Sequence, residues 1–275
     1  MDTSERPSGD PRGPARLPGL AGRRVLVTGG SRGLGEQIVR LLLATGARVA
    51  TCARGAEGLG ALAASLGAGE RARLHTEALD VTEPGRLEAF VHGMKKRFDG
   101  VDGVVACVGG ARGGDLGAST PEDWAATWDL NVGHTTRLVR AAVPHLRAAG
   151  GGSVVVVASI SGWKPGPGAQ YGAAKSAQIH LTASLARELG PDHIRVNAVS
   201  PGSMLVPGRR WDRMRREDPA AFAAFLAAEL PGGALVTPLE VARVVVFLLS
   251  DWASGVSGAH LPVDRAQNAP APDGY

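Results

Sequence analysis

The sequence predicts an α/β fold, a doubly wound parallel sheet of about seven strands with helices on both faces. Short runs of Val, Ala, Leu and Ile, which are typical of strands covered on both faces, alternate with segments of helical periodicity. Glycine-rich turns follow several of these runs. With 275 residues, 44% of them hydrophobic, the chain is long enough to bury a sizeable core.

Helical patterns fill the gaps between the strand-like segments. Apolar residues recur at helical spacing in 35–45. Thr120 followed by Pro121 marks a helix start, and Thr237 with Glu240 forms a capping box at the start of another helix. The expected strands are 24–28, 48–53, 73–78, 103–108, 153–159, 194–199 and 259–263.

The chain is expected to form one domain. Residues 1–22 are rich in Pro, Gly, Arg and Ser and predict a disordered arm, and residues 267–275 predict a short tail. No linker or repeat interrupts the strand and helix alternation of 23–266. The segment 203–236 breaks that alternation just after a strand, where a substrate lid is expected.

Composition favours a cytoplasmic protein without a metal site. The net charge of +4 allows a nucleic-acid binder as an alternative, but the arginines form no continuous basic block. Cys52 and Cys107 lie in apolar strand-like runs, so we expect buried free thiols in a reducing compartment. No Cys and His spacing resembles a metal site, no apolar run is long enough to span a bilayer, and no signal peptide is apparent.

A glycine-rich turn after the first strand predicts a dinucleotide-binding site. Glycines allow a tight turn and a close approach of pyrophosphate, and the following helix offers free N–H groups to phosphate. A purely structural turn is the alternative, but the strand before and the helix after match the expected context. The residues expected to bind the cofactor here are Thr28, Gly29, Ser31, Arg32, Gly33, Leu34 and Gly35.

The second strand indicates which dinucleotide is bound. NAD-preferring sites place an acidic residue at the end of this strand to bind the ribose 2′-hydroxyl. Arg54 stands there instead, and Arg32 lies in the glycine turn. Two guanidinium groups can bracket a 2′-phosphate, so the sequence favours NADP(H) over NAD, unless both are merely solvated surface residues.

Tyr171 and Lys175 are four residues apart in a helical segment and therefore share one helix face. A nearby ammonium group favours tyrosinate and lowers the phenol pKa. A tyrosine tuned in this way can donate a proton to a carbonyl oxygen or accept one from an alcohol. Taken alone, this spacing is also common on surface helices.

An ordered set of motifs then resembles the short-chain dehydrogenase/reductase family, in its single-domain branch and near its 3-oxoacyl-ACP reductase-like members. The resemblance covers about residues 20–266 and implies a Rossmann fold. The motifs in order are the glycine turn Thr28–Gly35, Asp80 with Val81, Asn131, Ser159, Tyr171 with Lys175, and the segment 197–202.

The resemblance implies a role for each matching residue. Tyr171 is the general acid/base, Ser159 binds the substrate oxygen, and Lys175 holds the nicotinamide ribose and lowers the Tyr171 pKa. Asn131 supports a water that links Lys175 to solvent. Further contacts to the cofactor are implied for Asp80, Val81, Gly109, Pro201 and Gly202.

The chain departs from the family pattern in the segment 106–109, where Ala-Cys-Val-Gly replaces Asn-Asn-Ala-Gly. Packing of Cys107 and Val108 could compensate, or the active site could be reshaped. Ser161 is a minority alternative to Ser159, because the spacing from Ser159 to Tyr171 is one residue shorter than the family pattern.

The leading functional hypothesis is an NADPH-dependent carbonyl reductase that reduces a ketone, such as a 3-oxoacyl thioester or a polyketide or other secondary-metabolite carbonyl, to a secondary alcohol. An NADP-dependent dehydrogenase of secondary alcohols and a non-catalytic NADP(H)-binding sensor are the alternatives. The resemblance also implies a homo-oligomer, a tetramer or dimer, built through helices in 124–149 and 170–189. No nucleic-acid or membrane partner is expected.

Overall fold

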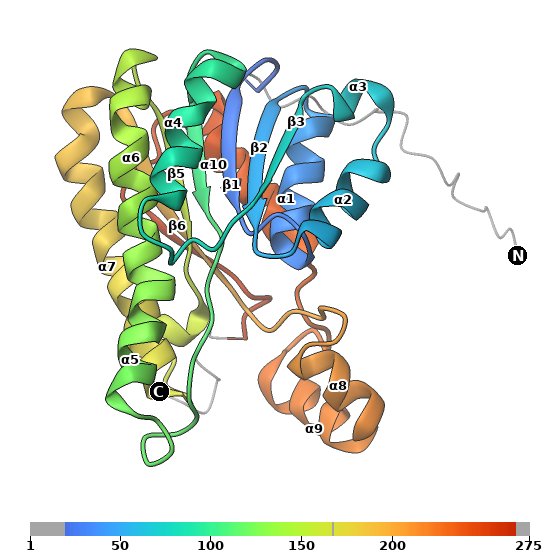
Figure 1. The fold of residues 1–275 in the computed structure, drawn as a ribbon. Coiled ribbons are helices and arrows are strands. Elements are labelled where there is room, and N and C mark those ends of the chain that lie inside the picture. The colour runs from blue at the N-terminus through green and yellow to red at the C-terminus, as the bar shows by residue number, and fades with distance from the viewer. Residues whose placement is uncertain (1–19, 167, 268–275) are drawn as a thin grey trace, which may run out of the picture.

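A computed structural model describes residues 20–166 and 168–267 of the chain. Its seven strands form one parallel sheet in the order β3-β2-β1-β4-β5-β6-β7 (Figure 1). The predicted doubly wound architecture is confirmed, and the strand order reverses between β1 and β4. The strands are β1 (Arg24–Thr28), β2 (Arg48–Ala53), β3 (Leu74–Ala78), β4 (Gly103–Ala106), β5 (Gly152–Val157), β6 (Ile194–Pro201) and β7 (His260–Val263).

Most strands differ from the sequence prediction by one or two residues at an end, and the fifth ends at Val157 rather than at residue 159. Two of the differences bear on the cleft. The fourth strand ends at Ala106 rather than at residue 108, because the Cys107 N–H donates to the Thr28 hydroxyl at 3.0 Å instead of continuing the ladder. The sixth strand continues beyond Val199 to Pro201, since its partner β7 pairs with it as far as Pro201. Both ends lie at the same edge of the sheet and shape the cleft described below.

Ten α-helices in the described residues surround the sheet. The predicted capping box at Thr237 is present, and Thr120 forms a second one with Asp123. A π-helical turn, Asp129–Gly133, widens the chain between α5 and α6. The helices are α1 (Gly33–Ala44), α2 (Ala56–Ala64), α3 (Ala68–Arg71), α4 (Arg86–Phe98), α5 (Pro121–Trp128), α6 (His134–Ala148), α7 (Ala169–Leu189), α8 (Arg210–Glu217), α9 (Pro219–Glu229) and α10 (Pro238–Leu249).

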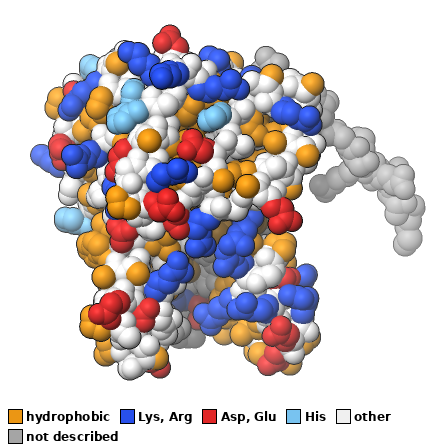
Figure 2. Space-filling view, viewed as in Figure 1, with side chains coloured by type: hydrophobic (Ala, Val, Ile, Leu, Met, Phe, Trp, Pro, Cys, Tyr) orange, Lys and Arg blue, Asp and Glu red, His pale blue; other side chains and the backbone are white. Residues whose placement is uncertain are grey.

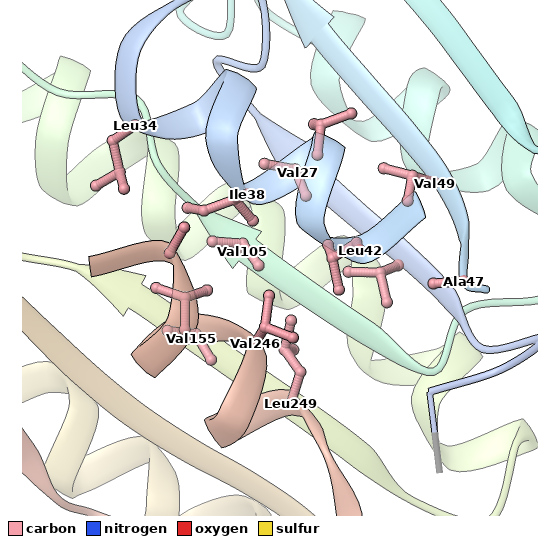
Figure 3. Close-up of a cluster of buried hydrophobic side chains, with 14 of the residues drawn as sticks. Val27, Leu34, Ile38, Leu42, Ala47, Val49, Val105, Val155, Val246 and Leu249 are labelled. Atoms are coloured by element: carbon pink, nitrogen blue, oxygen red, sulfur yellow. The ribbon is translucent and has the colours of Figure 1, made fainter. Parts of the chain in front are cut away.

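The core has two layers, because successive strand residues point to opposite faces of the sheet. On one face, Ile38 of α1 and Val246 of α10 pack over Val105 of β4 (Figure 3). On the other face, Val104 and Val154 pack with helices α4 and α6. Both faces of the central strands are therefore apolar, which is why these strands read as continuous hydrophobic runs.

The folded region extends slightly beyond the predicted limits at both ends. Leu20, predicted to lie in the arm, is buried in the core, and Gln267, predicted to begin the tail, is buried and accepts from Ser203 N–H at 2.8 Å. The rest of the predicted arm and tail, 1–19 and 268–275, lies outside the described residues. Helices α8 and α9 occupy the predicted lid segment and project below the sheet (Figure 1).

Within 20–166 and 168–267, every helix is too short or too polar to cross a lipid bilayer. In the same residues, His, Cys, Asp and Glu side chains form no group of three or more that could hold a metal ion.

Candidate active site

The carboxyl ends of the central strands open into a cleft of about 800 Å³. It lies where the strand order reverses, which is the usual ligand position in an open α/β sheet. Thr28 and Asn131, also predicted as site residues, are fully buried behind the cleft wall. The other predicted site residues line the cleft: Gly29, Ser31, Arg32, Gly33, Leu34, Gly35, Arg54, Asp80, Val81, Gly109, Ser159, Tyr171, Lys175, Pro201 and Gly202.

The turn between β1 and α1 has the geometry of a phosphate-binding loop. Gly29 has a φ of +80°, in the left-handed region that glycine favours. A Cβ at Gly30 would lie 2.1 Å from Thr51 Oγ1, and one at Gly35 would lie 2.2 Å from the Gly29 carbonyl oxygen. The Arg32 side chain does not cap α1, so the N-terminal N–H groups of this helix face the cleft. These features fit the phosphates of a dinucleotide.

Positive charge gathers at the same end of the cleft. Figure 2 shows Lys and Arg side chains on both sides of the hollow between the lid helices and the sheet domain. Arg32, Arg54 and Arg209 all line the cleft, and Arg209 comes from the lid. Burial and then the neighbouring charges, Arg32 among them, lower the pKa of Arg209 below its ordinary value.

Asp80 lies at the adenine end implied by the family resemblance. Its Oδ1 accepts from the Thr82 N–H at 2.9 Å and from the Thr82 hydroxyl at 2.7 Å. Burial alone would raise the pKa of Asp80. The Thr82 hydrogen bonds and the nearby charges of Arg54 and Arg112 outweigh burial, so the pKa is lowered and the carboxylate stays ionised.

The opposite part of the cleft holds Ser159, Tyr171 and Lys175. Ser159 follows β5, and its side chain hydrogen-bonds with that of Tyr171. Lys175 Nζ lies 5.5 Å from the centroid of the Tyr171 ring. Ser159 lines the cleft, whereas Ser161 only donates its N–H to Ser159 Oγ, at 3.1 Å. Of the two serines considered, the structure therefore brings Ser159 to the tyrosine.

The predicted effect of Lys175 on Tyr171 is not found in the structure. Burial raises the pKa of Tyr171, and the lowering contribution comes from the Ser159 hydrogen bond. The Lys175 ammonium group donates to the Val157 carbonyl at 2.9 Å and to Gln178 Oε1 at 2.8 Å. Burial also lowers the pKa of Lys175 to about 8.

Comparison with known proteins places this geometry in a family. A family model described as enoyl-(acyl carrier protein) reductase matches residues 29–265. The chain belongs to the short-chain dehydrogenase/reductase family. Members of this family are oxidoreductases that bind a nicotinamide cofactor, and the similarity supports redox chemistry between a carbonyl and an alcohol.

Several relatives share most of their length with this chain. An isoepoxydon dehydrogenase of Penicillium expansum is 35% identical, over 90% of this chain and 95% of its own. An uncharacterized NAD-dependent oxidoreductase of Mycobacterium tuberculosis is 34% identical, over 91% and 98%. The 3-oxoacyl-[acyl-carrier-protein] reductase FabG of Escherichia coli is 32% identical, over 88% and 96%. Among solved structures, a short-chain dehydrogenase/reductase family oxidoreductase of Burkholderia thailandensis superposes with a TM-score of 0.80 at 33% identity, covering 90% of this chain and 93% of its own.

The altered family segment 106–109 is braced in an unexpected way. The Cys107 N–H donates to Thr28 Oγ1, which lies 2.9 Å from Nε2 of the buried His134 on α6. Burial lowers the pKa of His134 to about 3, so the ring is neutral. The His134 side chain therefore links β1, β4 and α6.

Gly109, the one family residue kept in this segment, fits closely between two site residues. A Cβ at this position would lie 2.7 Å from Asn131 Oδ1 and 2.9 Å from Lys175 Nζ. Asn131 is fixed in turn, because its Nδ2 donates to the Gly110 and Thr127 carbonyls, both at 2.7 Å. Glycine is therefore needed here to let the lysine reach the cleft.

Two aromatic residues of the lid pack against each other and do not line the cleft. Trp211 and Phe225 stack on each other with ring centroids 3.9 Å apart, so they form the core of the α8–α9 pair. Met204 and Val206, at the base of the lid, line the cleft. The stacked pair is therefore part of the lid core, whereas Met204 is placed to contact a ligand in the cleft.

Two residues of the site were not singled out from the sequence. Arg209 was not predicted as a site residue, because its position in the cleft depends on how the lid folds. Gln178 follows Lys175 by three residues, a spacing that places both on one helix face and could have identified it.

Proposed function

We propose that this chain is an NADP(H)-dependent oxidoreductase that interconverts a ketone and a secondary alcohol, working mainly as a carbonyl reductase. The observation that carries the proposal is the hydrogen-bonded pair of Ser159 and Tyr171 beside Lys175, in a cleft whose other end is rimmed by arginines. A proton donor, an oxyanion partner and a cation lie together where a nicotinamide ring would meet its substrate.

The chemistry divides between the cofactor and three side chains. When bound, the nicotinamide supplies or accepts a hydride. In reduction, the Tyr171 phenol donates a proton to the carbonyl oxygen, while the Ser159 hydroxyl donates a hydrogen bond to that oxygen. Burial raises the pKa of Tyr171, so the phenol is protonated at neutral pH, which is the form that donates a proton in reduction. The Lys175 ammonium holds the ribose hydroxyls.

The basic rim supports NADP(H). Arg32 and Arg54 are joined by Arg209, and the residue directly after β2, which ends at Ala53, is Arg54 rather than an acidic one. The first acidic residue after this strand, Glu57, lies in the first turn of α2. A 2′-phosphate would relieve the repulsion among these guanidinium groups. The name of the Mycobacterium tuberculosis relative makes NAD the competing cofactor.

The names of the relatives suggest two classes of substrate. The Escherichia coli relative supports a 3-oxoacyl thioester, and the Penicillium expansum relative supports an alcohol like isoepoxydon or the ketone formed from it. We further propose one domain over about 23–266, a cytoplasmic location, and a homo-oligomer formed through α5, α6 and α7, where the Trp128 side chain is 50% exposed.

The proposal is tested by following NADPH absorbance with ketones, 3-oxoacyl thioesters and, in reverse, secondary alcohols. We expect Tyr171→Phe to abolish turnover while NADPH binding persists, and Ser161→Ala to retain turnover. Turnover that survives Tyr171→Phe would contradict the assignment of the acid. Tight NADPH binding by the wild-type protein without turnover on any substrate would instead support a non-catalytic sensor.

A further inference from the structure

Gln178 is a buried polar residue on the same face of α7 as Lys175. Its Oε1 accepts from Lys175 Nζ at 2.8 Å, and its Nε2 donates to the Asn131 carbonyl at 3.1 Å and to Thr135 Oγ1 at 2.7 Å. These partners fix the orientation of the amide, because an ammonium group only donates and a carbonyl only accepts. The side chain therefore connects Lys175 to the π-helical turn that carries Asn131.

The Asn131 carbonyl is fully used by protein donors. Besides Gln178 Nε2, it accepts from the Thr135 hydroxyl at 2.8 Å and from the His134 N–H. A carbonyl oxygen has two lone pairs, so these donors leave none for a further partner. The family resemblance implies a water between Asn131 and the lysine. In this chain a glutamine side chain makes that connection directly.

The Lys175 ammonium is held by neutral oxygens. Among the described residues it donates to the Val157 carbonyl and to Gln178, which leaves one of its three N–H groups for the cleft. The titratable groups that face it are Tyr171 on its own helix, Cys107 after β4 and His134 on α6. Burial raises the pKa of Cys107 to about 12, so this thiol, like the His134 ring, carries no charge near neutral pH.

We propose that Gln178 is a positioning residue of the catalytic group: its side-chain amide keeps the Lys175 ammonium charged and directed at the cleft, in the role that the family gives to a water. A carbonyl oxygen at 2.8 Å stabilises the charged form of a buried amine, and the second end of the amide anchors that oxygen to the wall. The catalytic consequence rests on the proposed function, whereas the ionisation of Lys175 can be measured without cofactor or substrate.

The test is an NMR titration of the lysine side chains. The chain has four lysines, so protein labelled with [ε-¹³C]lysine gives few signals, and a Lys175→Arg variant assigns the one of interest. Three variants are compared with the wild type. Gln178→Met removes both polar ends at similar length, Gln178→Glu keeps the acceptor and adds a negative charge, and Thr182→Val is the control.

Thr182 is a matched control because it is buried one turn further along α7. Its hydroxyl donates to the backbone carbonyl of Gln178 at 2.9 Å and makes no contact with the Lys175 ammonium group. Replacing it removes a buried polar group at similar cost. Thermal melts then separate loss of stability from a change in the ionisation of Lys175.

In the wild type we expect Lys175 to titrate near its pKa of about 8. Gln178→Met should lower this pKa by about one unit, because a hydrogen bond to the charged form is lost, and Gln178→Glu should raise it. Thr182→Val should leave it unchanged. An unshifted Lys175 in folded Gln178→Met overturns the proposal, and so does a shift of both Gln178 variants in the same direction.

Kinetics provide the second measurement. If turnover is found, its alkaline limb should move to lower pH in Gln178→Met and to higher pH in Gln178→Glu, with kcat more affected than KM. A purely structural role would lower stability and activity without moving the limb in opposite directions. Absence of turnover in the wild type would refute the proposed function, while the NMR titration would still decide the role of Gln178.

Discussion

Replacing Arg209 with Ala tests the cofactor end of the cleft. Arg209 lies on the lid and lines the cleft together with Arg32 and Arg54. Its pKa is lowered by burial first and then by neighbouring charges, Arg32 and Arg54 among them. A hydrogen bond to a charged group contributes about 1.5–3 kcal/mol. Because Arg209 is exposed to solvent, we take the lower part of that range, about 1.5–2 kcal/mol, which corresponds to about a 10- to 30-fold weaker NADPH affinity.

The loss should be specific for the 2′-phosphate. We expect the affinity for NADH, measured by the same fluorescence titration, to change by less than about twofold, and the NADPH affinity of the variant to depend less on salt. Arg213→Ala is the matched control, since Arg213 is a lid cation near Arg209 that does not line the cleft. Equal losses for NADPH and NADH, or no loss at all, would refute this reasoning.

Three further predictions follow from single contacts. Gly109→Ala should lower both stability and activity, because its new Cβ would displace the fixed Asn131 Oδ1 as well as the end of Lys175; kcat should fall by about 10²-fold in steady-state kinetics. His134→Gln should weaken the acid sensitivity of stability measured by urea unfolding. The pKa of His134 is lowered from 6.5 to about 3, so the wild type loses stability as pH falls through that window, by at most about 1.4 kcal/mol per pH unit. Ile38→Ala, at a fully buried contact between α1 and α10, should cost about 2–5 kcal/mol of unfolding free energy in the same assay at pH 7.

The fold was predictable because its strands are covered on both faces. Ten of the fifteen residues in the central strands β1, β4 and β5 are Val, Leu or Ala, a pattern that is typical of a parallel sheet covered on both faces. The exact ends of the folded region were harder to predict from the sequence. Leu20 joins the core although it lies in a Pro- and Gly-rich stretch. Gln267 is held by Ser203, which is distant in the sequence, so the local sequence does not predict this contact.

The site was predictable where its members share one local element. Tyr171 and Lys175 lie one turn apart on α7, and the glycine turn has strict steric needs. Residues that depend on long-range folding were missed or misjudged. Arg209 reaches the cleft only through the lid, and the raised pKa of Tyr171 reflects burial that the motif does not reveal.

Two adjacent residues of α6 connect the altered segment 106–109 and the Gln178 side chain in one hydrogen-bond network. His134 contacts Thr28 beneath the altered segment 106–109, and Thr135 contacts Gln178 beneath Lys175. The network holds a buried ammonium group whose pKa burial has lowered to about 8, so its charge opposes folding at neutral pH.

An apolar side chain at the position of Lys175 would leave the folded state more stable, since replacing buried ions by packed hydrophobic groups is often neutral or stabilising. Lys175 is a buried cation that lowers the stability of the fold, is held by two hydrogen bonds and lines the cleft. Such a group is typical of catalytic sites, where burial and neighbouring groups shift pKa values. A sensor that only bound a dinucleotide could do so with the glycine turn and the arginines at the far end of the cleft. The presence of a buried ammonium group that lowers stability at Lys175 therefore favours an enzyme over a sensor.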